Sequence, residues 1–170
     1  MYFLKKRKFQ GKAGSTSRRS RRVILLDSSI LMYAVKGKKK LPINIEEALR
    51  EVSEGAELAV LDTTINELQF LKEKAKGKTR IAADFALEFI DRLNIRIIHV
   101  SSRIIEDVSR ELRRGKAKDF HDEILIRAAK KLNAAVATVD FGLVKKLRKN
   151  NVTCYFLSGR NWIMISGYFD

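Results

Sequence analysis

The sequence predicts an α/β fold, in which a three-layer α/β/α domain surrounds a central, mostly parallel sheet. Short apolar runs alternate along the chain with segments whose apolar residues repeat at helical spacing. The runs show little polar alternation, which is typical of strands that helices cover on both faces. Strands and helices that alternate in this way form parallel pairs through helical crossovers. The 170 residues suffice for one domain with a hydrophobic core, and we find no internal repeat.

The clearest example is the stretch KDFHDEILIRAAKKLNAAVATVDFGLVKKL, residues 118–147. Asp119 is placed to cap a helix that Asn133 ends. The apolar face of this helix consists of Ile124, Leu125, Ala128, Ala129 and Leu132. Residues 135–139 then form a buried strand, and a second helix covers residues 141–148. Asp140 therefore stands at the carboxyl end of a strand, the edge at which open α/β sheets bind their ligands.

The remaining elements follow from the same two patterns. We predict further strands at residues 23–26, 58–61, 95–100 and 152–157. We predict further helices at residues 28–35, from Pro42 to Gly55, at 64–74, at 79–93 and from Ser101 or Ser102 to Arg114. The chain then divides into a basic, disordered arm (1–22), the α/β domain (23–157) and an apolar tail (158–170). We expect the tail to pack on the domain or on a partner.

The charge of the chain predicts a polyanionic partner. The formal net charge is +15, and nine cations without any acid lie in residues 1–22. Nucleic acid is the first candidate, because clustered cations bind phosphates. A membrane surface is a weaker alternative. The arm could also be a disordered, solvated segment without a binding role. The residues we expect to contact RNA lie in the arm and in two basic loops: Lys5, Lys6, Arg7, Lys8, Arg18, Arg19, Arg21, Arg22, Lys38, Lys39, Lys40, Lys116 and Lys118.

Several classes of protein are disfavoured. No apolar run approaches the length of a membrane-spanning helix, and the N-terminus lacks the apolar region of a signal peptide. The single cysteine, Cys154, has no partner for an internal disulfide, and two histidines do not make a zinc-ribbon pattern. We therefore expect a cytoplasmic protein that does not act at a membrane. Ribosomal proteins share the charge, so charge alone does not indicate an enzyme.

Four acids stand out because of where they lie: Asp27, Glu67, Asp122 and Asp140. Each has a structural explanation taken singly. Asp27 and Asp140 precede helices as N-caps, Asp122 complements a helix dipole, and Glu67 completes a capping box with Thr64. Asp62 and Asp119 are better explained as caps than as ligands.

Taken together, the four acids predict a metal site. Three of them follow strands, either directly or one helical turn later, so they converge on one edge of the sheet. Clustered carboxylates repel one another unless a cation lies between them, and hard oxygen ligands favour Mg²⁺ or Mn²⁺. One or two such ions would support the hydrolysis of phosphodiester bonds. No glycine-rich phosphate loop competes with this interpretation.

The segments LLDSSIL, NELQFL and HDEILIRAAKKLNAAVATVDFGLVKKLRKNNV resemble the PIN-domain nucleases over residues 23–157. The resemblance implies a PIN-like fold, with Asp27, Glu67, Asp122 and Asp140 as the catalytic, metal-binding acids. It also places Ser29 and Thr138 beside the metal. The basic arm, T-V-D, basic helix and Asn/Arg-bearing tail are most similar to PIN endonucleases of small-subunit pre-ribosomal RNA processing. His121 departs from that group, which often has a second aspartate there, and Asp119 is the residue that could compensate.

The resemblance implies a metal-dependent endoribonuclease for structured RNA, with precursor ribosomal RNA as the expected substrate and pre-ribosomal proteins as further partners. Hydrolysis would leave a 5′-phosphate and a 3′-hydroxyl. One alternative is a toxin-type PIN ribonuclease that cuts tRNA or mRNA beside an antitoxin. Another is a PIN scaffold that binds RNA during ribosome assembly without cutting it. The apolar tail could also form the interface of a homodimer.

Overall fold

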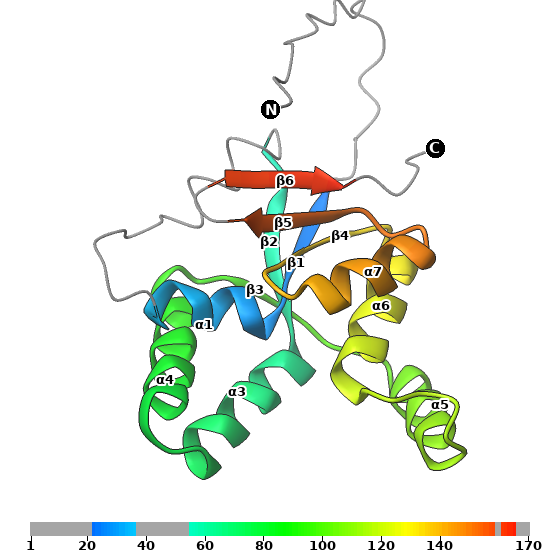
Figure 1. Ribbon diagram of the computed structural model, residues 1–170, viewed down its shortest axis with the longest axis horizontal. Helices are drawn as coiled ribbons and strands as arrows, with labels where there is room; N and C mark the ends of the chain where they lie inside the picture. Colours follow the sequence, from blue (N-terminus) through cyan, green and yellow to red (C-terminus); the bar gives the residue numbers. More distant parts are fainter. Residues whose placement is uncertain (1–21, 37–54, 159–160, 166–170) are drawn as a thin grey trace, which may run out of the picture.

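The computed structural model describes residues 22–36, 55–158 and 161–165, and these form one six-stranded sheet with helices on both faces (Figure 1). The strand order is β3-β2-β1-β4-β5-β6. The strands are β1 (Val23–Leu26), β2 (Glu57–Leu61), β3 (Arg96–Ile98), β4 (Ala135–Thr138), β5 (Cys154–Ser158) and β6 (Asn161–Ile165). The first five are parallel, and β6 pairs antiparallel with β5. The predicted mostly parallel sheet is therefore confirmed.

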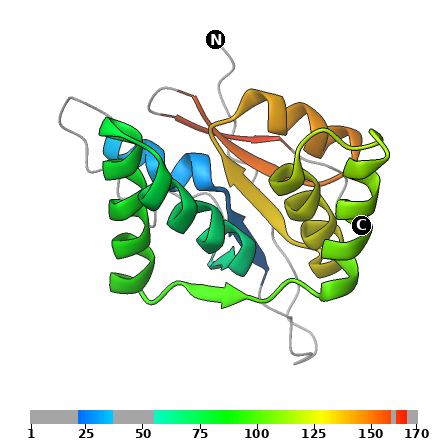
Figure 2. The same ribbon diagram turned by 90° about the horizontal axis from the view of Figure 1, so that it is seen from below.

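Two groups of helices enclose the sheet, as seen most clearly from below (Figure 2). The described helices are α1 (Ser28–Lys36), α3 (Asp62–Lys74), α4 (Gly77–Arg92), α5 (Ser102–Arg113), α6 (Phe120–Leu132) and α7 (Phe141–Lys149). The first three pack on one face and the last three on the other. None of these helices is long and apolar enough to cross a lipid bilayer. The helix predicted from Pro42 to Gly55 falls largely outside the described residues.

The core consists of two apolar layers that the strands separate. Ile24 and Leu26 of β1 pack with α1, α3 and α4, whereas Leu25 between them packs with α5, α6 and α7. All three side chains are buried, because both faces of the central strand are covered. This arrangement confirms the three-layer α/β/α fold and explains why the strands carry no polar alternation.

The beginning of α3 differs from its prediction. The helix begins at Asp62, two residues before Thr64, so Thr64 is not its N-cap and the predicted capping box with Glu67 is wrong. The Asp62 carboxylate accepts the backbone N–H groups of Thr63 and of Val100, at 2.8 and 3.1 Å. These bonds fix the first turn of the helix against the segment that follows β3. Glu67 therefore does not take part in capping α3, contrary to the prediction from the sequence.

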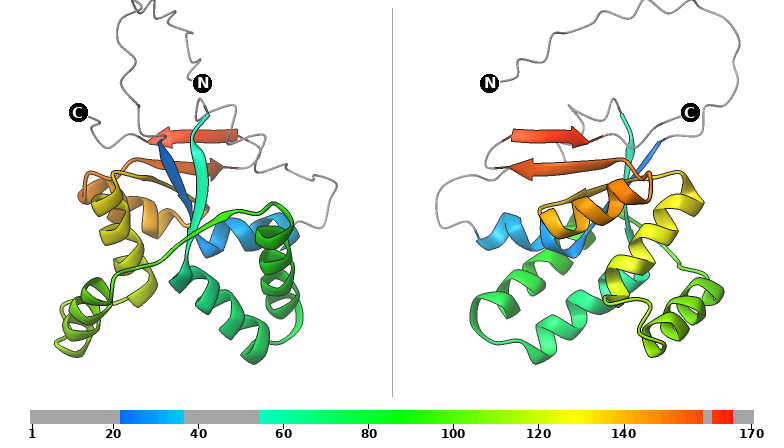
Figure 3. Two further views of the ribbon diagram at one scale, coloured as in Figure 1. Left: turned by 180° about the vertical axis from the view of Figure 1, so that it is seen from behind. Right: turned by 45° about the vertical axis from the view of Figure 1, so that its right-hand side comes forward.

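Other boundaries differ because they depend on pairing across the sheet. β3 has three residues rather than the predicted six, because it lies at the edge of the sheet, where β2 is its one neighbour among the described strands. β5 begins at Cys154 instead of Val152. Within the segment predicted only as an apolar tail, β6 extends the sheet beside β5, as both views in Figure 3 show.

Candidate active site

Asp27 lies at the point where the chain direction across the sheet reverses. It follows β1, whose two neighbours are β2 on one side and β4 on the other. Its backbone N–H donates to the carbonyl oxygen of Ala137 in β4 at 3.0 Å. Crevices at such switch points, beyond the carboxyl ends of the strands, are where α/β sheets bind ligands. The local sequence thus sets a carboxylate at the position where a ligand is expected.

Two hydroxyl groups fix the Asp27 carboxylate. Ser29 Oγ donates to Asp27 Oδ2 at 2.5 Å, and Thr138 Oγ1 donates to the same oxygen at 2.8 Å. The two hydroxyl oxygens lie 3.0 Å apart, and Thr138 Oγ1 also accepts the backbone N–H of Asp140 at 3.0 Å. Thr138 is fully buried. Both residues that the PIN resemblance placed beside the metal therefore contact the first acid directly.

Glu67 reaches this region from the second turn of α3. Its carboxylate accepts a hydrogen bond from the side chain of Ser28, the buried residue next to Asp27. His121 Nδ1, at the start of α6, lies 3.8 Å from Glu67 Oε2. Glu67 consequently connects α3 both to the end of β1 and to the beginning of α6.

Asp122 lies in the first turn of α6 and forms an ion pair. Lys146 Nζ in α7 lies 2.5 Å from Asp122 Oδ2, and the Asp122 side chain is only 19% exposed. Burial is the main cause of the raised pKa of Asp27, and the charge of Asp122 adds to it, so the two carboxylates lie within electrostatic reach. Asp119 caps α6, as predicted, by accepting the Asp122 N–H at 3.0 Å. Its charge also acts on Glu67.

Asp140 caps α7 and is connected to Asp27 through Thr138. Its Oδ1 accepts the backbone N–H groups of Gly142 at 2.7 Å and Leu143 at 3.3 Å. No described residue joins its side chain directly to the other acids. Electrostatic effects thus link Asp27 to Asp122 and to Glu67, and Glu67 to Asp119, while Asp140 is joined to Asp27 through Thr138. We call these five acidic residues the acid cluster.

Burial makes the ionised form of two of these acids unfavourable. It raises the pKa of Asp27 despite the hydrogen bonds from Ser29 and Thr138, and the charge of Asp122 raises this pKa further. Burial likewise raises the pKa of Glu67, against the opposing effects of His121 and Ser28. Carboxylates gathered in this way are stabilised by a cation.

The donor set fits a hard divalent cation in its chemistry, because it consists of carboxylate and hydroxyl oxygens. Within the described residues, however, no group of three or more His, Cys, Asp or Glu side chains is arranged to hold a metal ion. The ammonium group of Lys146 is the cation that contacts Asp122. Lys146 therefore occupies Oδ2 of Asp122, and its charge would compete with a divalent ion for this carboxylate.

Three residues contact the acids in ways that the sequence did not predict. Ser28 and His121 contact Glu67, and Lys146 contacts Asp122. Lys146 belongs to a run of cations in α7 that the sequence marks only as a basic helix. The run also contains Lys145, Arg148 and Lys149, which are exposed, whereas Lys146 is partly buried against α6. Only the packing of α7 on α6 distinguishes it from them.

Of the basic residues predicted to contact RNA, three can be located. Lys116 and Lys118 are exposed in the loop between α5 and α6, directly before Asp119, and Arg22 is exposed before β1. The loop thus carries two exposed cations within three residues of Asp119 in the chain. The others, residues 5–8, 18, 19, 21 and 38–40, lie outside the described residues.

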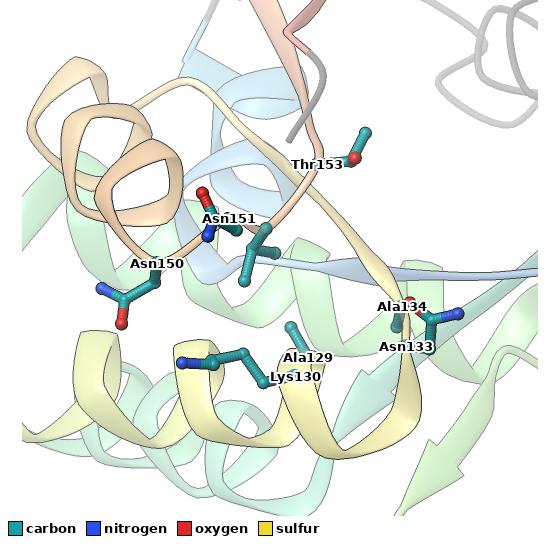
Figure 4. A pocket seen from close by; sticks show the side chains of 8 residues that line it. Ala129, Lys130, Asn133, Ala134, Asn150, Asn151 and Thr153 are labelled. Atoms are coloured by element: carbon teal, nitrogen blue, oxygen red, sulfur yellow. The ribbon is translucent and has the colours of Figure 1, made fainter. Parts of the chain in front are cut away.

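A pocket of about 240 Å³ lies at the opposite edge of the sheet (Figure 4). It is lined by Ala129, Lys130, Asn133, Ala134, Asn150, Asn151, Val152 and Thr153. These residues occupy the ends of α6 and α7 and the segments that lead into β4 and β5. Because the acids lie at the carboxyl ends of the strands, this pocket is separate from the acid cluster.

Comparison with solved structures supports the fold. VapBC2 from Rickettsia felis, solved with a DNA fragment from its promoter, is 19% identical with a TM-score of 0.57, covering 80% of this chain and 99% of that one. VapBC-1 from nontypeable Haemophilus influenzae is 15% identical with a TM-score of 0.54, covering 79% and 97%. A domain of a functionally unknown protein from Methanocaldococcus jannaschii is 16% identical with a TM-score of 0.53, covering 88% and 99%.

Comparison with sequence families gives a more direct assignment. A search of curated proteins finds no match. A family model described as a PIN like domain matches residues 24–160, from β1 to the connection between β5 and β6. Because this match covers most of the chain, the protein belongs to the PIN-like domain family, whose fold is that of nucleases.

Proposed function

We propose that this protein is a divalent-metal-dependent endoribonuclease that hydrolyses phosphodiester bonds in structured RNA, with precursor ribosomal RNA as its substrate. The observation that carries the proposal is the environment of Asp27. A carboxylate is held by two hydroxyl groups at the switch point of the sheet, within range of the charge of Asp122. Carboxylates whose pKa is raised by burial and by a nearby acid, and which lie at a ligand-binding edge of a sheet, are typical of functional sites.

Mg²⁺ or Mn²⁺ is the proposed cofactor, because PIN-domain nucleases generally use divalent metal ions. Asp27 and Asp122 would hold it, with Glu67, Asp140 and, as a further candidate, Asp119 completing the site. The ion would supply an activated water and stabilise the leaving oxygen. Ser29 and Thr138 would keep the Asp27 carboxylate oriented, and Glu67 would orient the attacking water or hold a second ion.

The charge of the chain supports RNA as the substrate. The net charge is +15, and the exposed Lys116 and Lys118 come shortly before Asp119 in the chain. These cations would hold the phosphate backbone next to a site that would otherwise repel it. The choice of precursor ribosomal RNA rests on the resemblance of the basic arm, the T-V-D motif and the tail to processing endonucleases. It brings with it pre-ribosomal proteins as partners and the cytoplasm as location.

A cleavage assay tests this proposal. The purified protein is incubated with a labelled pre-ribosomal RNA fragment in Mn²⁺, in Mg²⁺ and in chelator, beside Asp122→Asn and Asp27→Asn. We expect discrete cuts with 5′-phosphate ends that require metal and disappear in both variants, while RNA binding persists. Asp91→Asn makes the same change at an exposed position in α4 and should cut normally. Retained cleavage in Asp27→Asn would contradict the assignment of the site.

The second candidate is a toxin-type PIN ribonuclease that cuts tRNA or mRNA. The similarity in fold to two VapBC structures, over nearly the whole of those chains, favours keeping it. The same assay separates the two when tRNA and mRNA are included, since a toxin-type enzyme would prefer them and would arrest growth when expressed. Metal titration separates both enzymes from a scaffold that binds RNA without cutting, because a scaffold need not bind Mn²⁺ at the acids.

A further inference from the structure

Phe141 is an exposed aromatic side chain next to the acid cluster. It is the first residue of α7, directly after Asp140, and it is 56% exposed. Among the exposed large hydrophobic residues in the described part of the chain, it is the one adjacent in sequence to an acid of the cluster. An apolar ring at this position leaves hydrophobic surface in water beside the proposed reaction site.

The ring of Phe141 is held in place from below. Its centroid lies 5.8 Å from that of Phe156 in β5, with the ring planes tilted by 54°. Phe156 is the register partner of Thr138, the residue that donates to Asp27. The Asp140 cap fixes the backbone on which Phe141 stands. The ring is therefore positioned by the sheet itself, one strand away from the hydroxyl that orients Asp27.

Lys145 places a cation at the same ring. It is one helical turn beyond Phe141, and its Nζ lies 4.9 Å from the ring centroid. No described carboxylate lies within ion-pair distance of Lys145, in contrast to Lys146 beside it, which pairs with Asp122. A cation on an exposed ring stabilises a helix only slightly. A lysine in this position is available for a phosphate group.

We propose that Phe141 and Lys145 form a binding subsite for one unpaired nucleotide. Lys145 turns off the ring to pair with a phosphate, and the base stacks on the face of Phe141 that Lys145 leaves. Aromatic rings bind bases of any sequence in this way, but only when the base is free of its helical stack. The inference rests on the proposed function and assigns two residues of this chain to substrate binding. They would hold the unpaired nucleotide that lies beside the cleaved bond.

The test uses stacking as its readout, so it does not depend on cleavage. RNA hairpins carry the fluorescent base 2-aminopurine either in a loop or within the paired stem, and the full-length protein is titrated onto them in chelator. We expect wild-type protein to quench the loop base and Phe141→Tyr to do the same. Phe141→Ala should abolish quenching and weaken binding of the loop RNA about 5- to 150-fold. Phe85→Ala, an exposed phenylalanine in α4, is the matched control and should behave as wild type.

Two further variants make the result specific. Phe141→Leu retains apolar bulk without an aromatic face and should also lose quenching, which covers the case in which Phe141→Ala fails to fold. Lys145→Gln should keep quenching but lower the slope of log Kd against log salt concentration by about 0.7, the value for one phosphate contact in a single strand.

The outcomes separate this inference from the proposed function. If Phe141→Ala and Phe141→Leu quench and bind as wild type does, the subsite is refuted, even when wild type cuts RNA in Mn²⁺. If wild type never cuts RNA in Mn²⁺ but its quenching depends on Phe141, the enzyme proposal fails and the subsite stands. Equal quenching of loop and stem bases would overturn the preference for unpaired nucleotides.

Discussion

Replacing Thr138 with valine should destabilise the protein measurably, because its hydroxyl group joins three parts of the site. Thr138 Oγ1 donates to Asp27 at 2.8 Å and accepts the Asp140 N–H at 3.0 Å. Valine has a similar shape, so little cavity is created. Loss of a hydrogen bond to a charged group costs about 1.5–3 kcal/mol, and an unsatisfied N–H about 1–3 kcal/mol. Since solvent can reach part of the Asp140 backbone, we expect a total of about 2–4 kcal/mol.

Thermal and urea unfolding in chelator measure this loss. For a chain of this size, about 2–4 kcal/mol corresponds to a melting temperature lowered by roughly 5–15 °C. The same variant should bind Mn²⁺ more weakly at neutral pH, because the lost donor had held down the pKa of Asp27, which burial already raises. Thr79→Val, in α4 and outside this network, is the control. A loss no larger than that of the control would refute the view that Thr138 organises the site.

Three further predictions follow from the same geometry. Lys146→Met removes the cation that contacts Asp122. In calorimetric titrations, Mn²⁺ should bind this variant more tightly than it binds wild type or the control Lys145→Met. Unchanged affinity would show that Lys146 does not compete with the metal ion. Asp140→Asn keeps a capping oxygen, whereas Asp140→Ala loses it, so only the alanine variant should lose about 1 kcal/mol of unfolding free energy. If the Kd for Mn²⁺ is unchanged in both variants, Asp140 is not a metal ligand. Burial raises the pKa of Asp27 and of Glu67 above their unfolded values, so these two groups hold more protons in the folded state. The stability that they contribute without metal should therefore fall as the pH rises above about 4. In melts at pH 4–8, Asp27→Asn should therefore gain stability relative to wild type as the pH rises, and a pH-independent difference would contradict this.

Features that depend on local sequence could be predicted. Asp119 caps α6 and Asn133 ends it in the left-handed conformation, because capping is decided by residues within a turn of the helix end. The apolar runs fixed the strands for a similar reason, since burial on both faces removes polar alternation. These local rules also located Asp27 and Asp140 at strand ends, and the parallel sheet then brought those ends to one edge.

Features that depend on distant segments could not be predicted. The start of α3 is decided by Asp62, which accepts the N–H of Val100 from 38 residues away. β6 exists because it pairs with β5, which no local pattern distinguishes from simple apolar packing. Lys146 contacts Asp122 because α7 packs against α6. Nothing in the local sequence distinguishes Lys146 from the neighbouring cations Lys145 and Arg148.

Capping and metal binding need not exclude each other in this site. The capping bonds of Asp119 and of Asp140 are all accepted by Oδ1, and the two hydroxyl groups on Asp27 both donate to Oδ2. A carboxylate has two oxygens, and one that is fixed by protein donors leaves the second in a defined direction. The bonds that explain each acid structurally also restrict its rotation and reduce the entropy that a ligand would have to overcome. A helix cap in this position is therefore weak evidence against a metal ligand, and the gathering of several such acids at one switch point is the stronger observation.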